Sequence, residues 1–245
     1  DCLLSRGLGD VYKRQDLSRP PLLRLALIRS GERSHHFVWT RHHLLLDGWG
    51  TSQLLGEVLA RYHGAPPAPA PRPYRDYIAW LGGRDAAAHE RYWRAEMARL
   101  PEPTRLADAL RRPLGETGHG AVHARLDATQ TAALVAAARR ERVTPNTLVQ
   151  GAWALALSTV TGQRTVVFGA TVAGRPAELA GADRMLGLFI NTLPVVVEAD
   201  PETGVGAWLR ALQERNLVAR EHEHTPLHEI CLLYTSPSPR DKRQS

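Results

Sequence analysis

The sequence contains little cysteine and little lysine. Its 245 residues include two cysteines, Cys2 and Cys231, and two lysines, Lys13 and Lys242. All four lie within fifteen residues of a chain end, and the long interior carries its positive charge on arginine. A disulfide framework or a zinc site built on thiolates needs several neighbouring cysteines, so the interior excludes both. The absence of disulfides favours a cytoplasmic location.

Long hydrophobic runs are also missing. No apolar stretch reaches the ~20 residues of a transmembrane helix, and none follows a basic start as in a secretory signal peptide. We therefore predict no membrane partner. The formal net charge is +6, but the arginines are interleaved with acidic residues and form no basic stripe or aromatic platform. We interpret them as a solvated surface and predict no nucleic-acid partner.

Both ends of the chain differ in composition from the interior. Asp10–Gln15 and Cys231–Asp241 resemble translated sequencing adapters. Segments of this kind do not belong to a fold and are set aside. We predict non-native tails over residues 1–15 and 231–245, and interpret the sequence between them as an internal fragment of a longer protein.

Strand and helix patterns are mixed along the interior. Extended apolar runs bounded by turn residues predict strands over 22–29, 35–42, 122–126, 164–171 and 189–197. Periodic apolar residues with capping signals predict helices from residues 51, 74, 85, 127, 144 and 205. Without strict βαβ alternation, this order favours an α+β fold.

Two of these helices have a distinctive apolar pattern. In the helix from Thr51, one face gathers apolar side chains as far as Tyr62. The helix from Thr144 is apolar nearly all round, so we expect it to be buried. We also expect the large aromatic residues to lie in the core, namely Trp49, Trp80, Trp93 and Trp153.

The stretch His42–Gly50 shows the clearest chemistry. A histidine at the end of a strand, beside a turn, can reach a cleft while its neighbours stay packed, as a general base requires. Neighbouring strand residues point to opposite faces, so His42 and His43 are poorly placed to bind one ion. We predict no metal site, although Glu221–His224 is a second group of acidic and histidine residues. A simple pair of surface histidines is the alternative, because His35 and His36 also occur nearby.

Four motifs, in order, resemble those of the condensation domains of nonribosomal peptide synthetases. They are His42–Gly48 (His-His-x-x-x-Asp-Gly), Tyr74–Trp80, Gly174–Pro176 with Met185–Pro194, and Glu223–Ile230. Together they cover nearly all of residues 16–230. These domains belong to the chloramphenicol-acetyltransferase-like superfamily of acyltransferases.

The resemblance implies a fold and a reaction. The fold is an α+β, two-lobed chloramphenicol-acetyltransferase-like α/β sandwich, incomplete at both ends, with residues 16–115 in the N-terminal lobe and 116–230 in the C-terminal lobe. In the reaction, an aminoacyl thioester on an acceptor carrier protein attacks an acyl or peptidyl thioester on a donor carrier protein, and an amide forms. Phosphopantetheine arms carry both substrates, the domain itself binds no cofactor, and an adenylation domain is a neighbour.

The resemblance also implies roles for residues of the first motif. His43 is the catalytic histidine, and Gly48 lies near the tetrahedral intermediate, where its N–H can help an oxyanion. His42 and Asp47 are structural residues of the site. Asp47 is expected to pair with an arginine.

Two later positions also have expected roles. Asn191 and Arg175 are expected to line the cleft. The alternative for Asn191 is a turn amide whose hydrogen bonds are satisfied locally, and the alternative for Arg175 is a solvated surface side chain. Arg41, Gly50 and Val196 depart from residues that the family often has at these positions. The departures leave the donor, the acceptor and the stereochemical subtype open.

Three other functions fit the same sequence. An epimerisation domain shares the histidine motif, although Trp49-Gly50 after Gly48 favours the condensation form. A free-standing acyltransferase would use a soluble amine or alcohol. A noncatalytic member would only recruit partner proteins, but the presence of His43 argues against it. Because the family's opening segment and last strands are missing, we predict that this chain alone is inactive.

Overall fold

The computed structural model describes residues 17–110 and 121–234, in which helices and strands mix without regular βαβ order. The chain forms two compact units, described separately below. Unit 1 comprises the residues up to Arg84 together with Arg175–Ile190, and unit 2 comprises Asp85–Gly174 and the residues from Asn191 onward. The units divide the chain differently from the lobes predicted over 16–115 and 116–230, which remain a prediction for the complete domain. The α+β class is confirmed.

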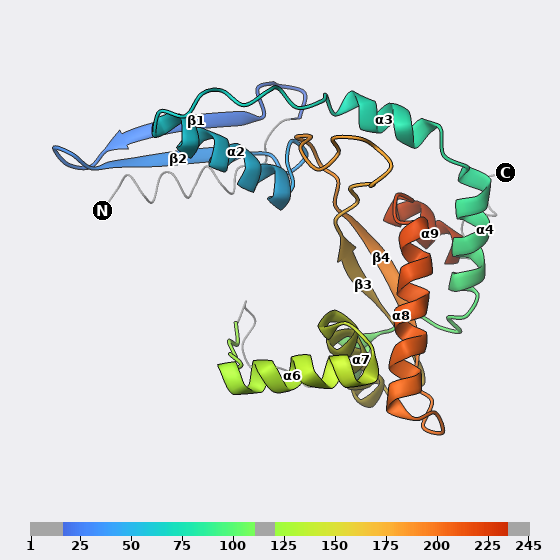
Figure 1. Cartoon of the computed structure of the whole chain (residues 1–245). Helices are drawn as coiled ribbons and strands as arrows, with labels where there is room; N and C mark the ends of the chain where they lie inside the picture. Colours follow the sequence, from blue (N-terminus) through green and yellow to red (C-terminus); the bar gives the residue numbers. More distant parts are fainter. Residues whose placement is uncertain (1–16, 111–120, 235–245) are drawn as a thin grey trace. The chain divides into compact units, whose positions relative to one another are not determined.

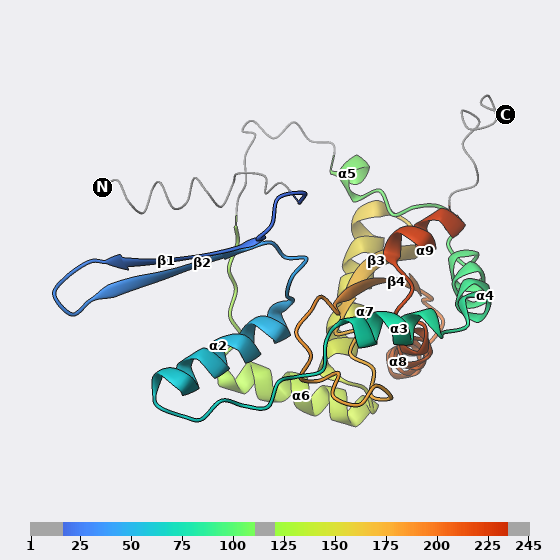
Figure 2. The same ribbon diagram turned by 90° about the horizontal axis from the view of Figure 1, so that it is seen from above.

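Unit 1 begins with a β-hairpin. Strands β1 (Leu23–Arg29) and β2 (His35–Arg41) pair antiparallel, within one residue of the predicted bounds. No third strand of the described chain joins them (Figure 1, Figure 2). Leu27 pairs with Phe37 across the strands, and these side chains are 70% and 54% exposed. The hairpin therefore presents an apolar surface to solvent.

Helix α2 (Gly48–Tyr62) begins three residues before the predicted start at Thr51, because Asp47 caps it. The apolar face expected on this helix is largely open to solvent. Leu59 and Tyr62 on this face are 58% and 83% exposed. Helix α3 (Arg75–Gly82) instead contributes to the core of unit 1, which also draws on the segment 175–190. The buried members of this core are Tyr77, Leu179, Ala182, Met185 and Phe189.

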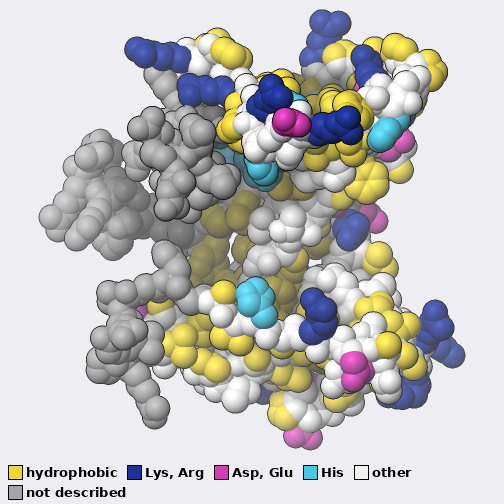
Figure 3. Space-filling view, turned by 90° about the vertical axis from the view of Figure 1, so that its left-hand side faces the viewer, with side chains coloured by type: hydrophobic (Ala, Val, Ile, Leu, Met, Phe, Trp, Pro, Cys, Tyr) yellow, Lys and Arg dark blue, Asp and Glu magenta, His cyan; other side chains and the backbone are white. Residues whose placement is uncertain are grey.

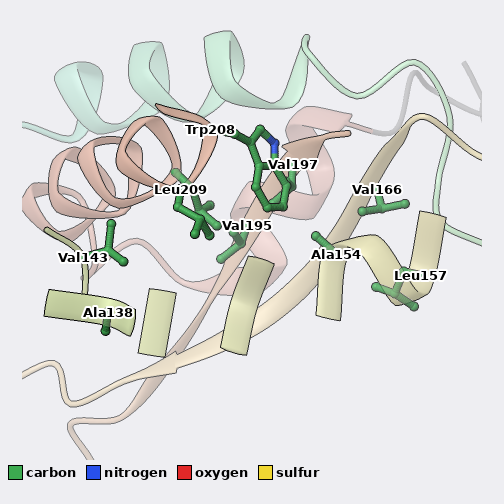
Figure 4. Close-up of a cluster of buried hydrophobic side chains, with 10 residues drawn as sticks. Ala138, Val143, Ala154, Leu157, Val166, Val195, Val197, Trp208 and Leu209 are labelled. Carbon is green, nitrogen blue, oxygen red and sulfur yellow. The ribbon is translucent and has the colours of Figure 1, made fainter. Parts of the chain in front are cut away.

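Unit 2 is built on a second antiparallel pair, β3 (Thr165–Val172) and β4 (Asn191–Glu198). Helices α6 (Ala128–Glu141), α7 (Pro145–Thr161) and α8 (Val205–Glu221) share a buried apolar cluster with this pair (Figure 4). The cluster comprises Ala138, Val143, Ala154, Leu157, Val166, Val195, Val197, Trp208, Leu209 and Leu212.

A second apolar cluster packs against the same strands. It involves helices α4 (Ala86–Met97) and α9 (Leu227–Tyr234), and its buried members are Trp93, Met97, Leu100, Val172, Leu193, Val196 and Ile230. Because successive strand residues face opposite sides, Val166 joins the first cluster while Val167 packs against the second. Both faces of β3 are therefore packed against apolar side chains.

Helix α9 was not expected from the sequence. It continues from Ile230 through residues 231–234, and Leu233 and Tyr234 pack against the second cluster. The non-native origin of 231–245 remains a prediction. The predicted tail over 1–15 and the rest of 231–245 lie outside the described residues.

Several local predictions were wrong. Residues 121–127 form no strand, and Val122 is 98% exposed, because no described segment pairs with it. The short helix α5 (Leu106–Ala109) was not predicted. Helix α7 buries only one side, and Trp153 on the other side is 47% exposed. Trp49 is 57% exposed as well, whereas Trp93 is fully buried as expected.

The distribution of arginine over the described surface agrees with the interpretation that these residues form no basic stripe. On the face in Figure 3, arginine side chains lie singly or in small groups among hydrophobic and neutral surface. Throughout residues 17–110 and 121–234, no helix combines the length and the apolar character that crossing a bilayer requires.

Candidate active site

The predicted site lies in unit 1, on the loop that joins β2 to α2. Asp47 ends this loop in an extended conformation and caps the helix, because its Oδ1 accepts a hydrogen bond from Gly50 N at 2.7 Å. The Thr51 hydroxyl donates to the carbonyl of Asp47 at 2.6 Å. Such a cap satisfies an amide that the first helical turn would leave unpaired. These hydrogen bonds hold the end of the loop, at Asp47, against the first turn of α2.

The Asp47 carboxylate is almost completely buried and is paired with Arg175. Arg175 Nη2 donates to Oδ1 at 3.2 Å. The side chain of Asp47 is 1% exposed and that of Arg175 is 8% exposed. Phe189 N donates to Oδ2 at 3.2 Å. A buried charge requires a partner and further hydrogen bonds to offset its desolvation, and Asp47 has both. The expected pairing of Asp47 with an arginine is confirmed.

Arg175 also fixes the segment that follows it. Its Nη1 donates to the carbonyls of Ala182 at 2.5 Å and Met185 at 2.9 Å. Its guanidinium carbon lies 4.0 Å from the centre of the Phe189 ring, a cation–π contact. The alternative of a solvated surface arginine is wrong. Arg175 instead joins the 175–190 segment to the start of α2.

Two aromatic residues add contacts to this segment. The Tyr74 hydroxyl donates to Leu188 O at 2.6 Å, and Trp49 Nε1 donates to Asp183 O at 2.9 Å. Burial raises the pKa of Tyr74, the negative charge of Asp47 raises it further, and Arg175 opposes them. Tyr74 therefore remains a neutral donor at physiological pH.

His42 holds the turn at the start of the loop. Its Nδ1 accepts from Leu44 N at 3.1 Å, and its carbonyl accepts from Leu45 N at 3.1 Å. Its own amide donates to Leu22 O at 2.9 Å, which ties the turn to the beginning of the hairpin. Because Nδ1 is an acceptor, the neutral ring carries its proton on Nε2. These contacts suit a structural residue.

His43 differs from its neighbour. It lies in the turn, is exposed, and its ring forms no hydrogen bond or ion pair with the rest of the described chain. Gly48, the first residue of α2, faces open space: beyond its chain neighbours and the backbone of its own helix, no described atom lies within 4 Å of the position a Cβ would take. Amides in the first helical turn lack intrahelical acceptors, so the Gly48 N–H suits an incoming anionic oxygen.

Asn191 belongs to unit 2, and its amide is fully used there. Its Nδ2 donates to Glu223 O at 2.8 Å and to Thr225 O at 2.7 Å, and its Oδ1 accepts from Thr192 N at 2.9 Å. This is the satisfied turn amide given as the alternative. It joins the start of β4 to the turn before α9. A cleft-lining role for Asn191 remains a prediction.

Sequence reasoning missed one residue of the site. Arg41, noted only as a departure from the family pattern, donates to Leu46 O at 3.2 Å and to the Thr51 hydroxyl. Its position directly before the two histidines was the available signal. Within the described ranges, no three His, Cys, Asp or Glu residues come together as metal ligands, the group at Glu221–His224 included.

Comparison with known proteins gives consistent results. The sequence profile of the family described as "Condensation domain" matches residues 9–245. The chain is 43% identical over 223 residues to a linear gramicidin synthase subunit of Brevibacillus parabrevis, covering 88% of the chain and 4% of the relative. It is 40% identical over 219 residues to chondramide synthase cmdD of Chondromyces crocatus, covering 87% of the chain and 6% of the relative. The chain thus spans a small part of these relatives.

Solved structures are similar in fold. The first condensation domain of the calcium-dependent antibiotic synthetase, in complex with a substrate analogue, superposes with a TM-score of 0.70 at 23% identity. That comparison covers 96% of the chain and 56% of the solved chain. The X-domain from teicoplanin biosynthesis gives a TM-score of 0.72 at 25% identity, covering 91% and 53%. These structures confirm the expected chloramphenicol-acetyltransferase-like fold.

Proposed function

The chain belongs to the condensation-domain family, and on that premise we propose that the protein forms amide bonds between carrier-bound substrates. The acceptor is an aminoacyl thioester and the donor an acyl or peptidyl thioester. The acceptor nitrogen attacks the donor carbonyl, a C–N bond forms and the C–S bond breaks. The amine proton leaves the nitrogen, and the donor thiol departs with one proton.

The observation that carries this proposal is the contrast between a fixed loop and an imidazole that bonds to no other residue of the described chain. The loop is held by His42 at its start and by Asp47 at its end, while the His43 ring remains available. An imidazole so placed can take the amine proton or orient the amine by a hydrogen bond. Gly48 N–H would donate to the carbonyl oxygen as it becomes negative.

The partners follow from the same premise. Phosphopantetheine arms of two carrier proteins would present the thioesters, an adenylation domain would be a neighbour, and the domain itself would hold no cofactor. A cytoplasmic location and the absence of membrane and nucleic-acid partners complete the proposal. The similarity to a linear gramicidin synthase subunit and to a chondramide synthase supports it.

The test uses the full-length protein that carries this sequence, with loaded donor and acceptor carrier proteins and detection of the amide by mass spectrometry. We expect His43→Ala to lower the single-turnover rate about 10²- to 10⁴-fold, the usual contribution of a general base. His36→Ala, on an exposed strand residue of the same hairpin, is the matched control and should retain the rate. Undiminished amide formation by His43→Ala would refute the role of His43.

The same assay separates the other functions. An epimerisation domain would exchange the α-hydrogen of a carrier-bound residue with deuterium and form no amide. A free-standing acyltransferase would accept a soluble amine or alcohol, and a noncatalytic member would bind carriers without turnover. We further predict that the 245-residue chain alone is inactive, since it spans 56% of the solved condensation domain. Amide formation by this chain alone would contradict that prediction.

A further inference from the structure

Arg41 connects the loop that carries His43 to the helix that follows it. It is the last residue of β2, and its Nη1 donates to Leu46 O at 3.2 Å. Its Nη2 donates to the hydroxyl of Thr51 in the first turns of α2. One guanidinium therefore spans the loop, from the strand before it to the helix after it.

Thr51 extends this connection to Asp47. Its hydroxyl accepts from Arg41 and at the same time donates to Asp47 O at 2.6 Å. Asp47 N in turn donates to Gly187 O at 3.2 Å. Hydrogen bonds in series polarise and strengthen one another. The end of the loop is thus fixed through Arg41 and Thr51 as well as through the buried ion pair.

The side chain of Arg41 is itself well placed for this contact. It is half-buried, and its guanidinium carbon lies 5.4 Å from the ring centre of Trp39, two residues earlier on the same strand. Stacking on an aromatic face suits the planar guanidinium, whose fixed fork of donors reaches two acceptors at once. A lysine has one ammonium and lacks this geometry.

Between these anchors two backbone amides donate hydrogen bonds to His42 and hold the turn, but the side chains there are poorly packed. Leu44 and Leu45 are 52% and 36% exposed, and His43 between the strand and these leucines is exposed too. The position of the imidazole therefore depends on the loop's two ends. A displacement of about 1 Å in a reacting group can cost about 10²-fold in rate.

We propose that Arg41 is a positioning residue for His43, holding the Leu46 end of the loop against α2 through two donors. This inference rests on the proposed function. In this role Arg41 does not contact the substrates. It acts by holding the imidazole of His43 in position.

Arg29 offers a matched control on the same hairpin. It makes the same kind of contact at the opposite end, where its Nε donates to Gly31 O at 3.0 Å and its Nη2 to Glu32 O at 3.4 Å. It fixes the turn between β1 and β2. Arg29→Gln and Arg41→Gln therefore remove the same charge and similar bonds, and only Arg41→Gln affects the loop of His43.

The experiment measures kcat and KM for loaded carriers in the full-length protein. We expect Arg41→Gln to lower kcat about ten- to hundredfold with little change in KM, and Arg29→Gln to leave both unchanged. Arg41→Lys should restore little of the lost kcat, since one ammonium cannot reproduce the two donors of the guanidinium. Thr51→Val should lower kcat and Thr51→Ser restore it, and Thr159→Val on α7, where an exposed hydroxyl donates to Leu155 O at 2.8 Å, is its control.

A second readout follows the loop directly. Amide hydrogen exchange at Leu44 and Leu45 should be faster in Arg41→Gln than in Arg29→Gln, at equal urea midpoints of unfolding. A wild-type protein that forms no amide would refute the proposed function, while the exchange rates would still report on the loop. An active wild type with Arg41→Gln at the Arg29→Gln rate would overturn the inference, as would equal exchange rates.

Discussion

Unit 1 buries a charged side chain at its site beside its apolar core, whereas the side chains that unit 2 buries completely are apolar. In unit 1 the centre of the site is a charge, Asp47, which is 1% exposed and is held by an ion pair and hydrogen bonds. In the described part of unit 2 the completely buried side chains are apolar, Trp93 and Leu212 among them. Charge contacts are directional and apolar packing is not. Unit 1 thus fixes positions, while unit 2 gains stability from area removed from water.

Removing the central charge should have the largest effect on stability. Asp47→Ala leaves Arg175 buried without a partner and removes the cap of α2, at a cost of about 3–5 kcal/mol for the broken pair alone. Urea unfolding of the full-length protein measures it. Asp76→Ala is the control, because its ion pair with Arg72 is partly exposed and worth about 0–1 kcal/mol. Equal losses of unfolding free energy in the two variants would show that the buried ion pair of Asp47 is worth no more than an exposed one.

A core truncation in unit 2 tests the other half of the comparison. Leu212→Ala should lower the free energy of unfolding by about 2–5 kcal/mol, from lost apolar transfer and the cavity left behind. Leu217→Ala on the same helix, at a side chain 59% exposed, should cost far less. The Leu212→Ala loss should also depend little on salt, and a strong salt dependence would contradict an apolar origin.

Crowding the site without changing any charge should have an intermediate effect. A Cβ on Gly187 would lie 2.1 Å from Tyr74 Cδ2, so Gly187→Ala must displace the ring that donates to Leu188 O. We expect a loss of about 1–3 kcal/mol in thermal or urea unfolding. Gly56→Ala on α2, where a Cβ meets nothing within 4 Å, should instead stabilise by about 0.5–1 kcal/mol. A harmless Gly187→Ala would show that the ring has room to move.

Alkaline pH provides a smaller test in unit 2. Burial and, to a smaller extent, the nearby negative charge of Glu96 raise the pKa of Tyr92 to about 12. Above about pH 10 the unfolded tyrosine ionises while the folded one stays neutral, so stability is lost as the pH rises from about 10 to 12. Tyr92→Phe should flatten this part of the unfolding profile. Parallel profiles for the variant and the wild type would assign the loss to other groups.

Local order was predictable where the signal lies within a few residues. The hairpin strands and the apolar strand at Val166 follow from periodicity and turn chemistry close by, whereas the cap at Asp47 was not predicted. The identity of the partner was not predictable. Arg175 reaches Asp47 from 128 positions away, and no local pattern identifies it. The functional prediction for His43 came from resemblance.

Predictions of burial failed for a related reason. Helix α7 is apolar nearly all round, yet Val149 and Trp153 are 56% and 47% exposed. The run 122–126 has strand composition, but a strand forms only with a partner, and none pairs with it in the described chain. Composition shows what a segment is able to bury. Only the arrangement of neighbours decides what is buried.

The central claim is that His43 acts on the substrates while Asp47 holds the loop that carries it. The most direct test measures the stability and the amide formation of His43→Ala and Asp47→Asn in the full-length protein. We predict that His43→Ala keeps the wild-type midpoint of unfolding, because its ring bonds to no other described residue, and loses at least about 10²-fold in single-turnover rate. Asp47→Asn should lose both stability and rate. Retained amide formation by His43→Ala, or a loss of rate that only follows a loss of folded protein, would contradict that claim.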